Sequence, residues 1–118
     1  MREKAENIII KTAGVLLILI LLSAHTLSSP AYGQTIHYLH VEGIVNPVMA
    51  EFIIKSIENA AKEKAETVVI QLDTPGGLDL SMRDIVKAIL SSDVPIVVYV
   101  APSGSRDASA GVFITYAA

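Results

Sequence analysis

The last of three serines in a stretch of small residues, Ser109, has the kind of neighbours that a reactive hydroxyl needs. Alanine and glycine follow it directly, and an apolar run continues over residues 112–118. A β-branched run at residues 94–100 comes before the stretch, so we predict that a strand leads into a turn and a helix leaves it. The first turn of such a helix would polarise the hydroxyl, and small neighbours would let a substrate approach. A nucleophile would be placed at such a position, which makes Ser109 a candidate.

A serine attacks a carbonyl efficiently only beside a base and beside donors for the oxyanion that forms. Candidate donors lie upstream, where Asp-Thr-Pro-Gly-Gly at residues 73–77 follows another β-branched run. Two successive glycines let the backbone turn its N–H groups outward, which makes the backbone of Gly76 and Gly77 a candidate for these donors. By themselves the residues leave two alternatives open. In the first, the glycine loop is a simple turn with no chemical role. In the second, Asp107 or Ser109 only caps the helix that follows.

The two loops and the strands before them resemble one protein family. The motif Leu-Asp-Thr-Pro-Gly-Gly at residues 72–77 is followed by Val-Tyr-Val-Ala-Pro-Ser-Gly at residues 98–104 and by Ser-Ala-Gly at residues 109–111. This combination is similar to the NfeD family of membrane-bound, Clp-class serine proteases, which are related to signal peptide peptidase A. The likeness covers most of the chain from Ile36 onward. Linked motifs in the right order are more specific than either motif alone.

This resemblance implies a crotonase-like fold in which Ser109 is the nucleophile and the backbone of Gly76 and Gly77 forms the oxyanion hole. In such proteases the general base is a lysine well downstream of the serine, and no residue of this chain matches it. The chain also departs from the family at Asp107, where a small residue is expected just before the nucleophile. Substrate contacts are expected at three positions in and beside the loops: Pro75, Gly104 and Ala110.

The first 33 residues have the layout of a secretory signal. Basic residues precede an almost uninterrupted apolar run at residues 13–24, and a tract of small residues follows it. Because a bilayer span needs roughly 20 apolar residues, the pattern favours a signal peptide cleaved before Gln34 over an uncleaved anchor. In either case residues 34–118 would be exported or would lie on the extracytoplasmic face of a membrane.

Composition narrows the classes of function further. The 118 residues are 52% hydrophobic and have a mean hydropathy of +0.53, and much of this excess lies in the apolar run of the signal segment. The absence of cysteine excludes disulfides and thiolate metal sites. A net charge of −3 with mixed signs argues against nucleic acid as a partner. His37 and His40 would point to opposite faces of a strand, so we expect neither a metal site nor a cofactor.

The elements that position the loops alternate between strand and helix. β-branched and aromatic residues predict three strands, at residues 35–43, 67–72 and 95–101, and the second is apolar enough to be buried on both faces. Apolar residues at helical spacing predict two helices, at residues 46–64 and 79–90. Asn46 is the expected N-cap of the first, and Asp79 or Ser81 of the second. This order predicts right-handed crossovers and a parallel α/β sheet with both loops at one edge.

A crotonase-like unit contains more strands and helices than this chain offers. We therefore expect residues 34–118 to be the N-terminal part of a longer protease domain, with an apolar segment at residues 112–118 that needs more chain or another subunit to cover it. The uncovered segment is compatible with a homo-oligomer. The predicted function is a membrane-associated serine endopeptidase with a Ser-Lys dyad that cleaves apolar segments of membrane proteins, inactive unaided because the lysine is absent.

Three other classes of function share some of these features. A catalytically inactive relative could bind peptides as an added strand and act as a scaffold in membrane quality control. A crotonase-type acyl-CoA enzyme would share the oxyanion hole, but the export signal argues against it because that cofactor is intracellular. A nucleotide-binding domain is disfavoured because the chain contains neither G-x-G-x-x-G nor a lysine-bearing phosphate loop.

Overall fold

The chain divides into two units, Met1–Gly33 and Gln34–Ala118. The computed structural model describes residues 1, 2, 4, 11–18, 33 and 35–118. In the first unit, residues 11–18 are helical. Among the described residues, no helix combines the length and the apolar character that a membrane crossing requires. Most of the predicted signal segment, and Gln34 at its predicted cleavage site, lie outside the described residues.

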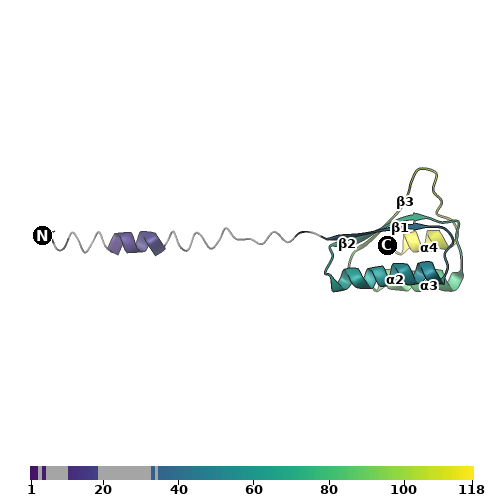
Figure 1. The fold of residues 1–118 in the computed structure, drawn as a ribbon, viewed down its shortest axis with the longest axis horizontal. Helices are drawn as coiled ribbons and strands as arrows, with labels where there is room; N and C mark the ends of the chain where they lie inside the picture. The colour runs from purple at the N-terminus through teal and green to yellow at the C-terminus, as the bar shows by residue number, and fades with distance from the viewer. Residues whose placement is uncertain (3, 5–10, 19–32, 34) are drawn as a thin grey trace. The chain divides into compact units, whose positions relative to one another are not determined.

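Strands and helices alternate through residues 35–118 (Figure 1). The strands are β1 (Ile36–Glu42), β2 (Thr67–Asp73) and β3 (Ile96–Val100), and the helices are α2 (Pro47–Lys62), α3 (Asp79–Leu90) and α4 (Ala110–Tyr116). The three strands form one parallel sheet in the order β1-β2-β3. Ile36 of β1 pairs with Thr67, and Val68 of β2 pairs with Ile96. The predicted parallel α/β arrangement is confirmed.

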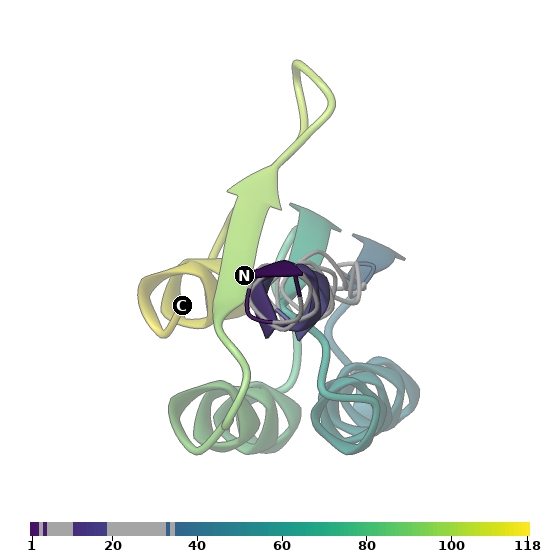
Figure 2. The same ribbon diagram turned by 90° about the vertical axis from the view of Figure 1, so that its left-hand side faces the viewer.

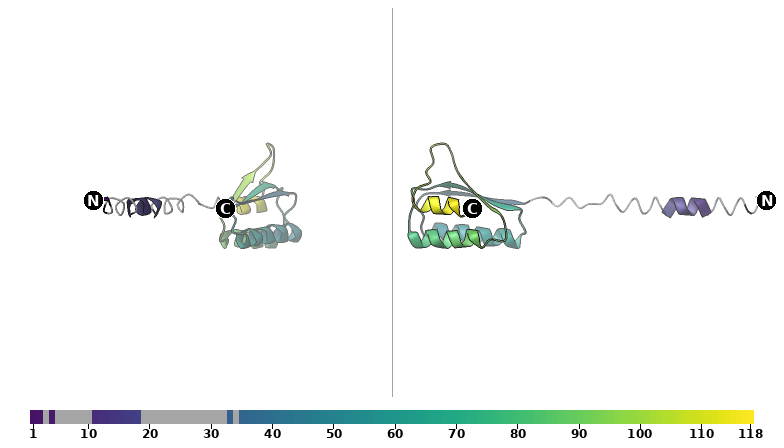
Figure 3. Two further views of the ribbon diagram at one scale, coloured as in Figure 1. Left: turned by 60° about the vertical axis from the view of Figure 1, so that its left-hand side comes forward. Right: turned by 180° about the vertical axis from the view of Figure 1, so that it is seen from behind.

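The helices cover one face of the sheet. Helices α2 and α3 lie side by side beneath it, and α4 packs against α3 and β3 (Figures 2 and 3). The core lies between these layers, and its largest fully buried side chains include Ile53, Ile70, Leu72, Ile85 and Ile114. Burial alternates along β2, with every second side chain only partly buried. The expectation that β2 is buried on both faces is therefore wrong for the described residues, because the helices cover only one of them.

Local sequence signals explain where the first of these helices begins. Asn46 is the N-cap of α2, where its side-chain oxygen accepts a hydrogen bond from the Met49 N–H at 2.9 Å, and Pro47 occupies the first helical position. Helix α3 differs from expectation. Its N-cap is Leu78, which makes no side-chain capping bond. Asp79 instead pairs with Arg83 at 2.7 Å, and Ser81 is buried, so neither of the two predicted caps serves as one.

The uncovered face of the sheet carries a small polar cluster. Tyr38 of β1 and Tyr99 of β3 both donate to the side-chain oxygen of Gln71 on the strand between them, the latter at 3.0 Å. The two tyrosine hydroxyls lie 3.2 Å apart. The hydrogen bond with Tyr38 raises the pKa of Tyr99 above its ordinary value. The three strands are thus joined by side chains as well as by the backbone ladder.

Candidate active site

The two loops singled out from the sequence meet at the carboxyl edge of the sheet. The segment between β3 and α4 first projects away from the sheet and then returns to it (Figures 1 and 2). On its return it pairs with the residue after β2. The Thr74 N–H donates to the Arg106 carbonyl at 2.8 Å, and the Ala108 N–H donates to the Thr74 carbonyl at 3.2 Å. Parallel strands end at a common edge, and this pairing brings residues about thirty positions apart together there.

Ser109 lies directly against Gly76. A β-carbon built on Gly76 would be 2.8 Å from the Ser109 Cβ and 3.3 Å from its Oγ. The first distance is shorter than real β-carbon contacts, so a larger residue at position 76 would force the loop or the serine to shift. Gly76 has φ +107, a value that also favours glycine. The convergence of the glycine loop with Ser109 that the topology predicts is present in the structure.

The backbone of Ser109 is strained. The residue has φ 53 and ψ −111, a combination that is unfavourable for a residue with a β-carbon. Ser109 occupies the N-cap position of α4, yet its side chain makes no capping hydrogen bond. The alternative that Ser109 caps the helix through its hydroxyl is therefore wrong. The hydroxyl makes no hydrogen bond within the described part of the chain, and the residue is exposed.

The two glycines differ in the use of their N–H groups. The Gly76 N–H donates to the Thr74 hydroxyl at 3.1 Å, so the expectation that both N–H groups face outward is wrong for Gly76, because the threonine captures the amide two residues on. The Gly76 carbonyl accepts from the Val45 N–H at 2.9 Å. A trans peptide places its N–H opposite its C=O, so the Gly77 N–H points away from Val45. Among the described residues, neither this N–H nor that of Ala110 has an acceptor.

The three predicted substrate contacts have different environments. Ala110 is buried directly after Ser109, with 4% of its surface exposed, and Pro75 is exposed directly before Gly76. Gly104 has φ +94, and a β-carbon built on it would have no neighbour within 4 Å, so it belongs to the projecting part of the loop. The structure therefore places Pro75 and Ala110 next to the Gly76 and Ser109 pair in sequence, but it does not bring Gly104 into contact with them.

Sequence reasoning missed two residues that hold the site together. The Asp73 carboxylate accepts a hydrogen bond from the Arg106 N–H at 2.8 Å, and Thr74 is completely buried between the two loops. A β-carbon on Gly111 would lie 2.6 Å from the Thr74 methyl and 2.4 Å from Asp107 Oδ1, so α4 can begin here only with glycine in its first turn. The signal that could have identified them is their position at the end of β2, directly before the turn that holds the glycine pair.

One carboxylate oxygen of Asp107, Oδ1, is buried without a hydrogen-bond partner among the described residues. The Asp107 Oδ1 therefore does not cap α4, and neither does the Ser109 hydroxyl.

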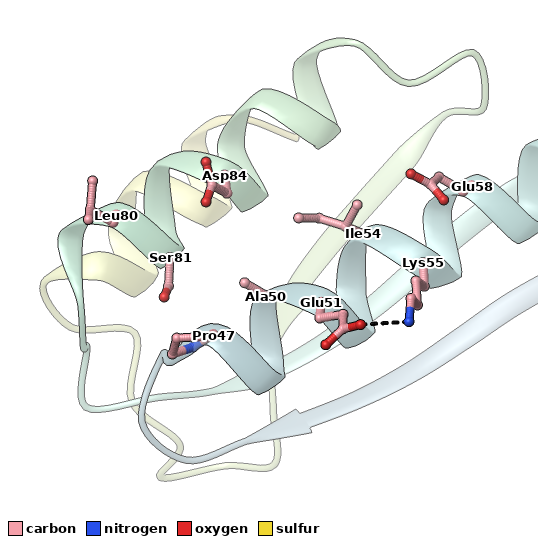
Figure 4. A pocket seen from close by; sticks show the side chains of 9 residues that line it. All are labelled: Pro47, Ala50, Glu51, Ile54, Lys55, Glu58, Leu80, Ser81 and Asp84. Atoms are coloured by element: carbon pink, nitrogen blue, oxygen red, sulfur yellow. Dashed lines mark hydrogen bonds and ion pairs between the residues drawn. The ribbon is translucent and has the colours of Figure 1, made fainter.

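Other features of the described residues do not compete with this site. No group of three or more His, Cys, Asp or Glu side chains in them is arranged to hold a metal ion. A groove of about 410 Å³ lies between α2 and α3 (Figure 4). An exposed ion pair, Glu51 with Lys55 at 2.6 Å, borders it, and neither Ser109 nor Gly76 lines it. The hydrogen bond and charge of Lys55 lower the pKa of Glu51.

Comparison with known proteins supports the resemblance seen in the motifs. Residues 35–118 match the family model described as the N-terminal domain of NfeD1b. The chain is 36% identical over 89 residues to the membrane-bound protease PH1510 of Pyrococcus horikoshii, which covers 75% of this chain and 20% of that protein. It is 33% identical over 88 residues to the membrane protein NfeD1b of Bacillus subtilis, with the same coverage. The chain thus spans about a fifth of the length of these curated relatives.

Solved structures show the same relationship. A lysine-to-alanine mutant of the 1510-N membrane-bound stomatin-specific protease, in complex with a substrate peptide, matches with a TM-score of 0.71 and 31% identity over 74% of this chain and 40% of that chain. ClpP1 from Listeria monocytogenes matches with a TM-score of 0.63 and 22% identity over 69% of this chain and 46% of that chain, which confirms a ClpP-like fold. The chain belongs to the NfeD1b N-terminal domain family.

Proposed function

We propose that this chain supplies the nucleophile and the oxyanion hole of a membrane-associated serine endopeptidase of the NfeD and Clp class. The observation that carries the proposal is the contact of Gly76 with the strained Ser109, because strain of this kind concentrates at functional sites. A hydroxyl that caps nothing and is exposed is available to attack a peptide carbonyl. The relatives named as proteases support the same assignment.

The oxyanion donors are the N–H groups of Gly77 and Ala110. Both lack an acceptor within the described residues, and both belong to residues next to the contact between Gly76 and Ser109. Preorganised backbone donors of this type are worth about 10²- to 10³-fold in kcat. Gly76 contributes differently from our first expectation. Its own N–H is held by Thr74, and its lack of a side chain leaves room for the serine.

The general base is a lysine from outside these 118 residues. No described side chain hydrogen-bonds the Ser109 hydroxyl, and the solved relatives include both a serine and a lysine mutant of 1510-N. A lysine becomes a base at neutral pH when burial lowers its pKa. The chain by itself should accordingly hydrolyse peptides very slowly.

The substrate is an apolar segment of a membrane protein, and cleavage takes place on the extracytoplasmic face. The N-terminal segment holds the enzyme at the membrane, and the enzyme works as a homo-oligomer. The relative 1510-N is named as stomatin-specific and was solved with a substrate peptide, which supports a protein substrate. The apolar run at residues 13–24 supports the membrane association, and the exposed Phe113 and Tyr116 of α4 support assembly with further protein.

The test is hydrolysis of apolar peptides by the full-length protein that contains this chain. Ser109→Ala should lower kcat by about 10³-fold or more, as loss of a catalytic serine does in other serine proteases. Ser103→Ala is the matched control, because Ser103 is exposed on the projecting loop and should leave kcat unchanged. Undiminished cleavage by the Ser109 variant refutes the proposal. Peptide binding without hydrolysis in the parent protein would replace it with a peptide-binding scaffold.

A further inference from the structure

The strained conformation of Ser109 must be imposed by its surroundings. A residue with φ 53 and ψ −111 relaxes unless contacts on both sides fix its backbone. On the C-terminal side, the Gly111 N–H donates to the Ala108 carbonyl at 3.0 Å, which closes a tight turn around Ser109. On the N-terminal side, the chain is held by hydrogen bonds to the end of β2. Ala108 takes part in the restraints on both sides, and its partner at the end of β2 is Thr74.

The backbone of Thr74 fixes the approach to the serine. The Thr74 N–H donates to the Arg106 carbonyl at 2.8 Å, and the Thr74 carbonyl accepts from the Ala108 N–H at 3.2 Å. The segment immediately before Ser109 therefore runs parallel to the chain at Thr74. The Asp73 carboxylate adds a third bond to the Arg106 N–H at 2.8 Å. These contacts define where Ser109 begins its turn, but they would survive most changes of the Thr74 side chain.

The side chain of Thr74 acts on the other parts of the site. Its Oγ1 accepts from the Gly76 N–H at 3.1 Å and lies 3.3 Å from the Gly76 carbonyl, so it sets the conformation of the glycine loop. Its methyl group lies where a side chain on Gly111 would be, and so packs on the first turn of α4. The residue is completely buried. One side chain therefore contacts the loop that carries the Gly77 N–H and the helix that carries the Ala110 N–H.

We propose that Thr74 is a positioning residue, whose hydroxyl holds the glycine loop at the distance from Ser109 that the reaction requires. This inference rests on the proposed function. The hydroxyl fixes the Gly76 amide, and the next peptide carries the Gly77 N–H. Loss of the hydroxyl frees the Gly76 amide to rotate and displaces the neighbouring donor, while the methyl group keeps α4 in place. The two halves of the side chain can be separated by substitution.

The experiment compares two variants of the full-length protein. Thr74→Val keeps the shape and the methyl group but removes the hydroxyl, and Thr74→Ser keeps the hydroxyl but removes the methyl group. A displacement of 1 Å at a reacting group can cost about 100-fold in rate, so we expect kcat of the valine variant to fall about 10- to 100-fold with little change in KM. The serine variant should keep kcat within about threefold of the parent.

A second measurement separates positioning from mere loss of structure. Hydrogen exchange of the Gly76 amide should accelerate in the valine variant at a temperature where the protein is fully folded, and the pH midpoint of kcat/KM should not move, because Thr74 exchanges no proton with the substrate. Parent-like kcat in the valine variant, or equal losses in both variants, overturns the inference. The Ser109→Ala comparison tests the identity of the nucleophile separately, so a failure of the proposed function can be distinguished from a failure of this inference.

Discussion

Gly76→Ala is the substitution that most sharply tests the contact between the glycine loop and the serine. The new β-carbon would lie 2.8 Å from the Ser109 Cβ, 3.1 Å from the Ala108 carbonyl oxygen and 3.3 Å from the Ser109 Oγ. Two of these atoms belong to a short side chain and one to the backbone, and the adjoining segment is tied to Thr74. The serine must therefore move, or the glycine loop must.

The expected loss of stability in Gly76→Ala has two parts. Alanine at φ +107 is strained whatever the space around it, at a cost of about 1–2 kcal/mol. The overcrowding adds about 1–3 kcal/mol. Gly43→Ala isolates the first part, because Gly43 has φ +112 and a β-carbon there would have no neighbour within 4 Å. The difference between the two variants is the cost of crowding against Ser109 and Ala108.

The assay is urea unfolding of the chain followed by circular dichroism. Gly76→Ala should lower the free energy of unfolding by about 1–3 kcal/mol more than Gly43→Ala does. In the full-length protein it should also slow acylation of Ser109, whereas Gly43→Ala should not. Equal destabilisation by both variants, within about 0.5 kcal/mol, would refute the contact from which the site is built.

Three further predictions concern the frame around the site. Gly77→Ala would place a β-carbon 2.1 Å from the Val45 carbonyl oxygen, so urea unfolding should show a loss of about 3 kcal/mol, and a loss below about 1 kcal/mol would contradict the packing. Asn46→Ala removes the cap of α2 and should cost about 1 kcal/mol by the same assay, with Asn46→Ser recovering most of it. The pKa of Tyr99 lies above its ordinary 10.0 because of its hydrogen bond with Tyr38. A raised pKa means that the stabilisation is complete below pH 10.0 and is lost as the pH rises through the pKa of the folded protein. Absorbance titration of tyrosinate should show a lower midpoint in Tyr38→Phe, and an unchanged midpoint would contradict this.

Much of the fold could be predicted from local patterns. The apolar run at residues 67–72 predicts strand β2, and the turn residues after it predict a loop, without any knowledge of the rest of the chain. Asn46 and Pro47 mark the start of α2 because capping depends on neighbouring residues only. The meeting of Gly76 with Ser109 followed from topology, since parallel strands end at one edge.

The rest depends on contacts between distant segments. The capture of the Gly76 amide by Thr74 is local in sequence, but its consequence appears only when the nucleophile loop packs on the same residue. The expected cap of α3 at Asp79 is wrong because the Asp79 carboxylate pairs with Arg83 within the helix. The strain at Ser109 has no signal in the residue types, because serine is also a common helix cap. Pattern alone therefore could not choose between cap and nucleophile.

The most direct test of the central claim is to treat the full-length protein with a fluorophosphonate probe and to locate the modified residue by mass spectrometry. The account predicts one modified serine, Ser109, with modification abolished in Ser109→Ala and unchanged in Ser103→Ala. Modification of a different residue, or no modification of a folded full-length protein that cleaves peptides, would show that Ser109 is not the nucleophile.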